Sequence, residues 1–376
     1  MLVDAWLPRA AAARPAQVAV NSLSYRELLA QAERAARQLS AMGVARQDRV
    51  GIELEPGEDF AVALHAVLLL GAVAVPIDPS APTELKAERT AGARTVISGP
   101  LLGHEDPAAQ LALRHELNDV AVVIYSSGSS GSGKAIELTY GNFWWSAAGS
   151  AVALGLDPDE RWLSVLPLTH VGGMSILMRA VIYGTTAIVE PRFDRASVLE
   201  RLSEQGGPTL VSLVPTTLQR LLDVGLCDPP SLRWVLLGGG PISPNLVAEA
   251  NRAAVPLAPS YGMTEACSQV VTLGAPLFCT QVDIAPSSEV LIAGPTVAPQ
   301  CGDWLRSGDL ASRNEAGELE IVGRLSEIII SGGENISPER VEEVLLGHPA
   351  VADVAVVGRA DPDWGEAVTA LIVPEG

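Results

Sequence analysis

Small and polar residues dominate residues 125–142, which read YSSGSSGSGKAIELTYGN. The stretch follows an apolar run at residues 120–124, which is typical of a buried strand. Glycines let successive backbone N–H groups turn toward one anion, serine hydroxyls add donors, and Lys134 adds a point charge. The pattern predicts a nucleotide-phosphate loop. A flexible Gly/Ser linker is the alternative, but linkers seldom follow a buried strand directly or hold one of only two lysines, Lys86 and Lys134.

The same loop nearly matches the G-x-x-x-x-G-K-[ST] motif of P-loop nucleotidases. Gly128, Gly133 and Lys134 fit the motif, but Ala135 stands where a hydroxyl would bind Mg²⁺. The chain also lacks a clear run of four apolar residues that ends in the aspartate of a second P-loop motif. A P-loop ATPase is therefore a disfavoured alternative.

Four further stretches offer groups that suit a nucleotide. Residues 261–265, YGMTE, bring together a ring that can stack on a base, a hydroxyl for phosphate and a carboxylate for Mg²⁺. Three glycines at residues 238–240 follow an apolar run, so a flat ligand could lie against the backbone there. Asp309, in the turn SGD, suits a ribose diol, and Arg324 supplies a cation. Singly each signal is weak, since Asp309 alone is more often a turn-former and Tyr261 more often a core residue.

Hydrophobic periodicity predicts the elements that would hold these groups. Residues 49–77 read as strand, helix and strand, a β-α-β unit that favours a parallel sheet. Residues 162–189 repeat this layout, which suggests two related α/β halves. Short strands alternate with turns over residues 286–330 and predict a small β-rich unit. The tail reads as a helix at residues 338–346 between strands, with a last strand at residues 367–373.

Length and composition limit the class of protein. A chain of 376 residues suits two or three units, and a content of 48% hydrophobic and 18% charged residues describes a globular protein with a large core. The net charge of −19 argues against nucleic acid or an anionic membrane surface as a partner. It also repels nucleotides, so a phosphate site must be built locally from backbone amides, Lys134, arginines and a metal ion.

The cysteine pattern and the N-terminus favour a cytoplasmic location. Cys227, Cys267, Cys279 and Cys301 have no C-x-x-C spacing, which indicates reduced thiols and neither a zinc site nor a disulfide framework. The N-terminus lacks the basic and apolar regions of a signal peptide. The longest apolar run, at residues 61–75, is too short to span a bilayer, so we expect no membrane insertion. A homodimer is compatible with the sequence, which does not report the oligomeric state.

Together and in this order, these stretches closely resemble the adenylate-forming superfamily of acyl-CoA synthetases, luciferases and adenylation domains, over nearly the whole chain. Four segments are most similar to the branch that ligates o-succinylbenzoate to coenzyme A in menaquinone biosynthesis, namely residues 167–184, 210–222, 261–270 and 323–345. The resemblance implies an acid–CoA ligase that forms an acyl-adenylate and uses ATP, Mg²⁺ and coenzyme A. Another acyl- or aryl-CoA ligase is the nearest alternative.

The resemblance also implies a domain plan. An α/β N-terminal domain at residues 1–323, made of two α/β subdomains plus a small β-barrel, would bind ATP and the acid. A partial α+β C-terminal domain would follow at residues 324–376 and rotate about a hinge at Ser326.

Site residues carry over from the family motifs to matching positions of this sequence. The ATP phosphates would be held by Ser126, Ser127, Gly128, Ser129, Ser130, Gly131 and Lys134. The adenine would be framed by Gly238, Gly239, Gly240, Tyr261 and Gly262. Thr264 would contact phosphate and Glu265 would bind Mg²⁺, while the ribose hydroxyls would be held by Asp309 and Arg324. The acyl substrate would meet His170, Ser212, Thr216, Gly262, Met263 and Ser268, with His170 between the acyl pocket and the path of the thiol. The predicted catalytic set is Lys134, His170, Thr264, Glu265 and Arg324.

The sequence departs from the family pattern at several places. The family's adenylation step normally uses a lysine near the end of the C-terminal domain, but no lysine follows Lys134. Gly133 and Ala135 replace the usual Pro and Gly of the phosphate loop. We therefore expect binding of ATP and acyl-adenylate to survive better than their formation, and a binding protein without catalysis is a rival reading. The last strand is expected to lie at an unprotected sheet edge.

Overall fold

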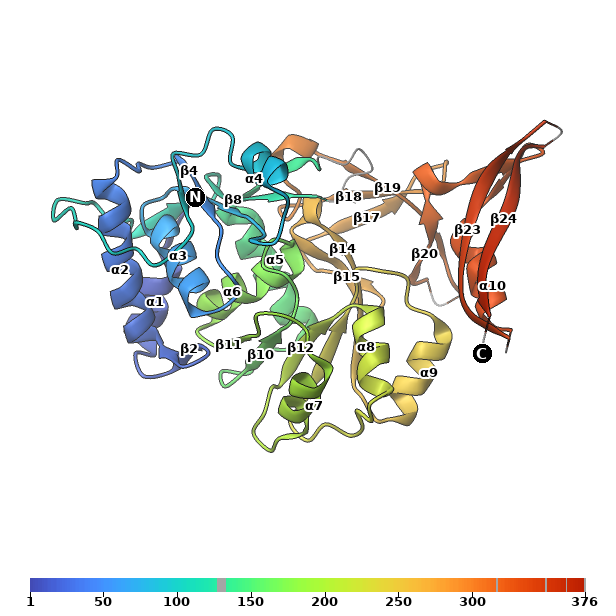
Figure 1. The fold of residues 1–376 in the computed structure, drawn as a ribbon, viewed down its shortest axis with the longest axis horizontal. Helices are drawn as coiled ribbons and strands as arrows, with labels where there is room; N and C mark the ends of the chain where they lie inside the picture. The colour runs from blue at the N-terminus through green and yellow to red at the C-terminus, as the bar shows by residue number, and fades with distance from the viewer. Residues whose placement is uncertain (127–132, 316, 349, 363, 375–376) are drawn as a thin grey trace.

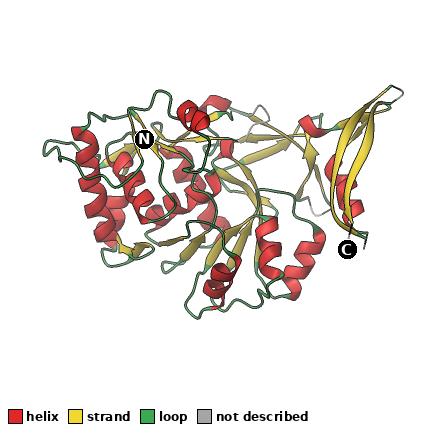
Figure 2. Cartoon of the chain, in the orientation of Figure 1, coloured by secondary structure: helices red, strands yellow, loops and turns green. Residues whose placement is uncertain are grey.

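The computed structural model describes residues 1–126, 133–315, 317–348, 350–362 and 364–374. Helices pack around two β-sheets in the larger part of the molecule, and the C-terminal strands extend from one end of it (Figure 1). Helices gather in the part that holds the N-terminus, whereas strands dominate the part that leads to the C-terminus (Figure 2). The architecture is the mixed α/β class that the sequence predicts.

The first sheet has five strands in the order β6-β4-β5-β8-β9. These strands are β4 (Arg49–Ile52), β5 (Val73–Pro76), β6 (Thr95–Ile97), β8 (Val120–Tyr125) and β9 (Ala135–Thr139). The first four run parallel, and β9 returns antiparallel to β8. The helices of this part of the chain are α2 (Tyr25–Ala41), α3 (Glu58–Leu69), α4 (Thr83–Arg89) and α5 (Tyr140–Leu154). The predicted first β-α-β unit is present as β4-α3-β5.

The second sheet has nine strands in the order β16-β15-β14-β13-β12-β10-β11-β2-β3. In chain order they are β2 (Val18–Val20), β3 (Leu23–Ser24), β10 (Arg161–Ser164), β11 (Thr186–Val189), β12 (Leu210–Leu213), β13 (Trp234–Leu237), β14 (Leu257–Met263), β15 (Ser268–Thr272) and β16 (Ala275–Pro276). Its helices are α1 (Trp6–Ala13), α6 (Val171–Tyr183), α7 (Arg195–Ser203), α8 (Pro215–Leu222) and α9 (Pro244–Arg252). The second predicted unit is β10-α6-β11, so each half of the predicted repeat lies in its own sheet. Within the described residues, no helix is long and apolar enough to cross a bilayer.

Strand β9 leads without a loop into α5, and this junction contacts the second half of the molecule. Thr139 caps α5 by accepting a hydrogen bond from the backbone N–H of Asn142, whose side-chain oxygen accepts one from the N–H of Thr139. The Asn142 amide also donates to the carbonyl oxygens of Pro295 and Val297 at 2.9 and 3.0 Å. One buried side chain therefore ties the end of β9 to the segment that follows β18.

The predicted β-rich unit forms a four-stranded antiparallel sheet from β17 (Gln281–Ile284), β18 (Glu289–Ala293), β19 (Leu305–Arg313) and β20 (Leu319–Arg324). These strands pair in sequential order, and a closed barrel is not confirmed. The C-terminal sheet contains β21 (Ile329–Ser331), β22 (Glu334–Ile336), β23 (Val351–Asp361) and β24 (Gly365–Pro374), with α10 (Pro338–Leu346) between β22 and β23. The expectation that the last strand is an edge is wrong, because β24 lies between β21 and β23, and β23 takes the edge.

Two elements between residues 80 and 118 are not predicted from the sequence. Helix α4 buries none of its side chains, so it lacks the apolar stripe that reveals a helix. Strand β7 (Arg114–Glu116) is only three residues long and pairs with β1 (Leu2–Asp4), more than a hundred positions earlier. Pairing at that distance leaves no local pattern in either segment.

A cluster of rings joins the N-terminal segments to α5. His115 of β7 stacks on Tyr140 with 4.1 Å between ring centroids, and Trp6 of α1 meets both rings edge-on. His115 is 5% exposed and His65 of α3 is 2% exposed. Burial lowers the pKa of each imidazole to about 4, and the neighbouring His115 further lowers that of His65.

These two histidines make stability sensitive to acid. Both imidazoles stay neutral in the folded protein down to about pH 4, whereas in the unfolded chain they take up protons below the ordinary pKa of 6.5. Their contribution is therefore present above pH 6.5 and is lost as the pH falls toward 4. We expect acidification from pH 7 to pH 5 to lower the free energy of unfolding by about 2 kcal/mol per histidine.

The variant H115F keeps a ring against Tyr140 and removes one of the two titrations. Urea unfolding at pH 7 and pH 5 should therefore show that acidification lowers the free energy of unfolding less in H115F than in the wild type. An equal loss in both proteins would contradict the assignment.

Candidate nucleotide and acyl site

The phosphate loop connects two antiparallel strands. Tyr125 at the end of β8 pairs with Ala135 at the start of β9, and the backbone N–H of Ser126 donates to the carbonyl oxygen of Lys134 at 2.9 Å. Gly133 has a φ of 71°, and a Cβ there would overlap the carbonyl oxygen of Ser126, so the turn requires glycine. The loop returns into a strand, whereas a P-loop opens into a helix, so the topology argues against the P-loop ATPase.

Most of the predicted phosphate ligands fall in the middle of this loop. Ser127, Gly128, Ser129, Ser130 and Gly131 lie outside the described residues. Ser126 and Lys134 lie at the two ends of the loop, and the side chain of Lys134 is exposed.

Three of the predicted nucleotide residues meet around one carboxylate. The Tyr261 hydroxyl donates to Oδ2 of Asp309, and Nε of Arg324 donates to Oδ1, both at 2.8 Å. Asp309 and Arg324 are paired in register on β19 and β20, and Tyr261 comes from β14. Asp309 is only 5% exposed. Burial and the Asp309 charge raise the pKa of Tyr261, and Asp309 raises the pKa of Arg324 against the opposing effect of burial.

The three glycines at residues 238–240 follow β13 and reach the strand that carries Tyr261. A Cβ on Gly238 would overlap the carbonyl oxygen of Ser260, the residue before Tyr261. Gly262 is packed still more tightly, since a Cβ there would overlap the carbonyl oxygen of Ser268 on β15. The structure therefore brings the predicted adenine residues onto neighbouring backbones at one end of the second sheet.

Lys134 and Glu265 each lie within electrostatic reach of Cys301. Glu265 belongs to the short helix η1 (Thr264–Ala266), and its carbonyl oxygen accepts a hydrogen bond from Ala298 at 2.8 Å. Burial and then Glu265 raise the pKa of the Cys301 thiol, while Lys134 lowers it, so both charges lie within electrostatic reach of the sulfur. The described residues contain no cluster of three or more acidic, histidine or cysteine ligands. A single carboxylate still fits Mg²⁺, since this ion is commonly bound by one or two carboxylates plus substrate phosphates.

A buried polar network lies under the predicted acyl pocket. The indole N–H of Trp162 donates to Oγ of Ser212 at 2.9 Å, and the guanidinium of Arg179 lies 5.4 Å from the Trp162 ring centre. Arg179 also donates to Oγ of Ser146 at 3.2 Å, and Ser146 donates to the carbonyl oxygen of Cys267 at 2.7 Å, next to Ser268. The predicted acyl residues Ser212 and Ser268 therefore flank one connected network.

Arg179 is a residue of this site that the sequence reasoning missed. It is 2% exposed, its Nε makes no hydrogen bond with the described residues, and burial lowers the pKa of its guanidinium. A buried arginine needs a partner, since a buried charge without one is costly. The signal was available in the sequence, because Arg179 is the one charged residue in the apolar helix at residues 171–183.

The remaining predicted residues lie at the surface or away from this network. His170 is exposed at the N-cap of α6; partial burial and Arg89 lower the pKa of its imidazole, and Asp78 raises it. The hydrogen bonds of the described part of the chain do not link Thr216 or Met263 to Arg179. Ser326 lies exposed in the short helix η3 (Leu325–Glu327), directly after β20.

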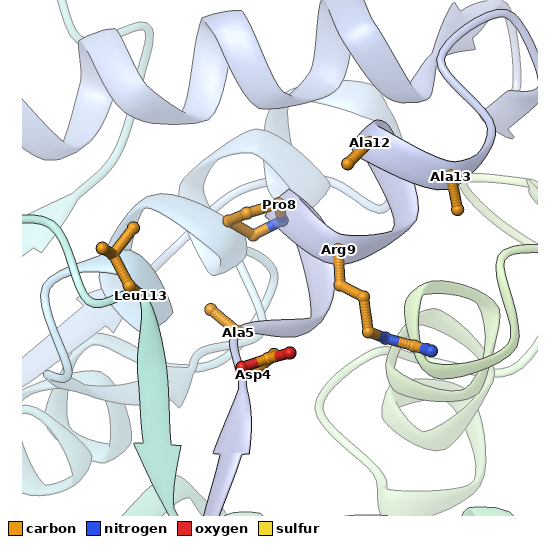
Figure 3. Close-up of a pocket in the computed structure, with 7 residues that line it drawn as sticks. All are labelled: Asp4, Ala5, Pro8, Arg9, Ala12, Ala13 and Leu113. Carbon is orange, nitrogen blue, oxygen red and sulfur yellow. The ribbon is translucent and has the colours of Figure 1, made fainter.

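An open hollow of about 510 Å³ lies elsewhere, on α1. Its lining residues are Asp4, Ala5, Pro8, Arg9, Ala12, Ala13 and Leu113 (Figure 3). Arg9 extends from α1 toward α6 and donates to the carbonyl oxygen of Ile182. None of the predicted site residues lines this hollow, so it is not the candidate site.

Comparison with protein families defines the class of this protein. The family model described as AMP-binding enzyme matches residues 7–111 and 86–325, and the model of the AMP-binding enzyme C-terminal domain matches residues 340–376. The chain therefore belongs to the AMP-binding enzyme family.

Particular relatives narrow the comparison. The chain is 33% identical to 2-succinylbenzoate–CoA ligase of Bacillus subtilis (strain 168), over 98% of this chain and 87% of the relative. It is 32% identical to 2-succinylbenzoate–CoA ligase of Listeria monocytogenes, over 98% of this chain and 89% of the relative. Among solved structures, it resembles o-succinylbenzoate CoA synthetase from Bacillus subtilis in complex with its acyl-adenylate, with a TM-score of 0.92 and 32% identity over 100% of this chain and 89% of that chain. The structure of the same synthetase in complex with ATP and magnesium ion gives a TM-score of 0.91 and 32% identity, over 100% of this chain and 90% of that chain. These likenesses confirm the predicted family and fold class.

The Asp309 carboxylate generates a prediction on nucleotide binding. The variant D309N keeps the shape of the side chain but removes the charge that Tyr261 and Arg324 contact. Because hydrogen bonds to charged groups contribute about 1.5–3 kcal/mol, we expect the Kd for ATP to rise by about tenfold to a hundredfold. Isothermal titration calorimetry measures it, and D283N, at an exposed aspartate of β17, is the matched control. Equal affinities in all three proteins would contradict the role of Asp309.

Proposed function

We propose that this chain is an ATP-dependent acid–CoA ligase that activates o-succinylbenzoate as an acyl-adenylate and transfers the acyl group to coenzyme A, as in menaquinone biosynthesis. The observation that carries the proposal is the likeness over the full chain to the Bacillus subtilis synthetase in complex with its acyl-adenylate. The curated relatives named 2-succinylbenzoate–CoA ligase support the same acid.

In the first half-reaction, a carboxylate oxygen of the acid attacks the α-phosphorus of ATP. The bond from that phosphorus to the bridging oxygen breaks, and pyrophosphate leaves with the electron pair. Negative charge builds on phosphate oxygens, so we assign its stabilisation to the backbone of the phosphate loop, Lys134 and the Thr264 hydroxyl. Glu265 would hold Mg²⁺, which when bound offsets phosphate charge. Asp309 would accept hydrogen bonds from the ribose hydroxyls beside Arg324 and Tyr261.

In the second half-reaction, the sulfur of coenzyme A bonds to the acyl carbon of the adenylate. The bond from that carbon to the phosphate oxygen breaks, AMP leaves with the electron pair, and the thiol proton passes to solvent. We place His170 between the acyl pocket and the path of the thiol. Its position at the exposed N-cap of α6 supports this role, because a group that meets an incoming thiol must be open to solvent. Partial burial and Arg89 lower the pKa of its imidazole, which favours the neutral form near pH 7.

The second carboxylate of o-succinylbenzoate requires a cation, and Arg179 meets that requirement. Its guanidinium is buried, its Nε has no hydrogen-bond partner among the described residues, and it lies in the network between Ser212 and the backbone of Cys267. A charge-assisted hydrogen bond from this group would satisfy both the acid and the orphan donor. A fatty acid or benzoate would leave Arg179 unpaired, which supports a dicarboxylic acid over other acyl-CoA ligase substrates.

We further propose the two-domain plan, with residues 1–323 and 324–376 as separate domains and Ser326 as the hinge. The exposed position of Ser326 directly after β20 supports it. A cytoplasmic location and a homodimer complete the proposal; the four cysteines are free thiols, which supports the first, and light scattering tests the second.

Acid-dependent release of AMP and pyrophosphate tests the function. We expect release with o-succinylbenzoate, and none with benzoate or a medium-chain fatty acid, each assayed with and without coenzyme A. No release of AMP or pyrophosphate with any acid, together with tight binding of a non-hydrolysable acyl-adenylate mimic, would instead indicate the alternative, a binding protein without catalysis.

Arg179 generates a prediction on acid specificity. In R179K the charge is kept but the planar fork is lost, so we expect the KM for o-succinylbenzoate to rise about tenfold while the Kd for ATP changes less than twofold. R220K, at an exposed arginine of α8, is the matched control. A change of equal size for ATP and for the acid would show that Arg179 has only a structural role.

A further inference from the structure

Arg89 lies beside the start of the phosphate loop. It is the last residue of α4, and its Cζ lies 5.3 Å from the centre of the Tyr125 ring. The Tyr125 hydroxyl in turn donates to the carbonyl oxygen of Arg89 at 3.2 Å. Tyr125 ends β8 directly before the loop, and Figure 1 shows α4 next to β8. The two contacts hold the guanidinium at the entrance of the loop.

The guanidinium of Arg89 has no acidic partner in the described part of the chain. Its Nε is buried and makes no hydrogen bond there. Lys86, on the same helix, differs because it forms an ion pair with Glu53 at 2.8 Å. A buried donor on a cation is costly to leave without a partner, so the position suits an anion from outside the chain.

The surroundings of Arg89 also favour an anion. Its charge reaches His170, which begins α6, and the N-terminal end of a helix carries a partial positive charge. Asp78 is the acidic group near His170, and its carboxylate already accepts two hydrogen bonds from Ser80 at 2.7 and 2.8 Å. The cluster therefore offers a free cation on the side of the site where His170 lies.

Arg89 and Lys134 belong to different faces of the first sheet. Tyr125 and Ala135 are paired across β8 and β9 and pack together with Val123 on one face. Because side chains alternate along an extended chain, we expect Lys134, directly before the start of β9 at Ala135, to point away from that face. Arg89, which lies over the Tyr125 ring, is thus separate from the predicted contact of Lys134 with the ATP phosphates.

We propose that Arg89 binds a phosphate group of coenzyme A while the thiol approaches the acyl-adenylate. The inference rests on the proposed function and adds a substrate-binding residue for its second half-reaction. Pyrophosphate offers the same phosphoanion chemistry from a second source, and it is the alternative that the experiment must separate.

The experiment combines chemically prepared o-succinylbenzoyl-adenylate with coenzyme A and follows thioester formation, which bypasses the first half-reaction. In R89Q we expect the KM for coenzyme A to rise about tenfold, with kcat changed less than threefold, because one charge-assisted contact is lost. R89K keeps the charge and should stay within threefold of the wild type. R26Q, at an exposed arginine of α2, is the matched control. Calorimetric titration with inorganic pyrophosphate should give the same Kd for R89Q and the wild type.

Two outcomes would overturn the proposal. One is a KM for coenzyme A in R89Q within twofold of the wild type; the other is weaker pyrophosphate binding with an unchanged KM for coenzyme A, which would assign Arg89 to pyrophosphate. Thermal unfolding reports whether each variant folds. Y125F is a milder variant, because it keeps the ring under Arg89 and removes only one hydrogen bond. We expect it to raise the KM for coenzyme A by about threefold.

A failure of the proposed function looks different. The wild type would then form no thioester from the adenylate, whereas calorimetric titration of the wild type and R89Q with coenzyme A would still show whether Arg89 binds its phosphates.

Discussion

A protein with a net charge of −19 must hold anionic substrates, and this constraint shapes the whole site. Long-range electrostatics repel ATP, coenzyme A and a dicarboxylic acid, so attraction has to come from short-range groups. The chain has only two lysines, and many of its arginines are ion-paired at the surface. The cations predicted or proposed for the site are spread over separate elements: Lys134 at the base of the hairpin, Arg324 on β20 and Arg179 inside α6. Arg324 is positioned by Asp309, and Arg179 by Ser146 and the Trp162 ring.

The second feature of the candidate site is the close approach of neighbouring backbone segments. At Gly262 and Gly238 the chain touches the carbonyl oxygen of a neighbouring strand, so no side chain separates β13, β14 and β15 at that end. A flat ligand can then lie against peptide groups, and their dipoles are fixed before the ligand arrives. Preorganised dipoles of this kind cost no reorganisation during the reaction.

The buried network around Arg179 joins both halves of the molecule. Ser146 comes from α5, which follows the first sheet, whereas Trp162 and Ser212 belong to strands of the second. Polar atoms placed there bear a cost unless they are satisfied, and Nε of Arg179 has no hydrogen-bond partner among the described residues. Nε of Arg89 likewise has no hydrogen-bond partner in the described part of the chain.

Local signals in the sequence determined most of the fold and part of the site. Each β-α-β unit shows an apolar strand, an apolar helix and a terminating glycine, because these patterns depend on neighbours in the chain. The phosphate loop and the motif at residues 261–265 are visible for the same reason. Only the tertiary structure decided which distant residues meet. Asp309 and Arg324 are brought together by the pairing of β19 with β20, Tyr261 reaches Asp309 from β14 in another sheet, and the last strand is central because β21 pairs with it. The roles proposed for Arg179 and Arg89 depend on what surrounds them. The lone charge in an apolar helix marks Arg179 in the sequence but does not say what it contacts, and Arg89 lies on a short exposed helix without an apolar pattern.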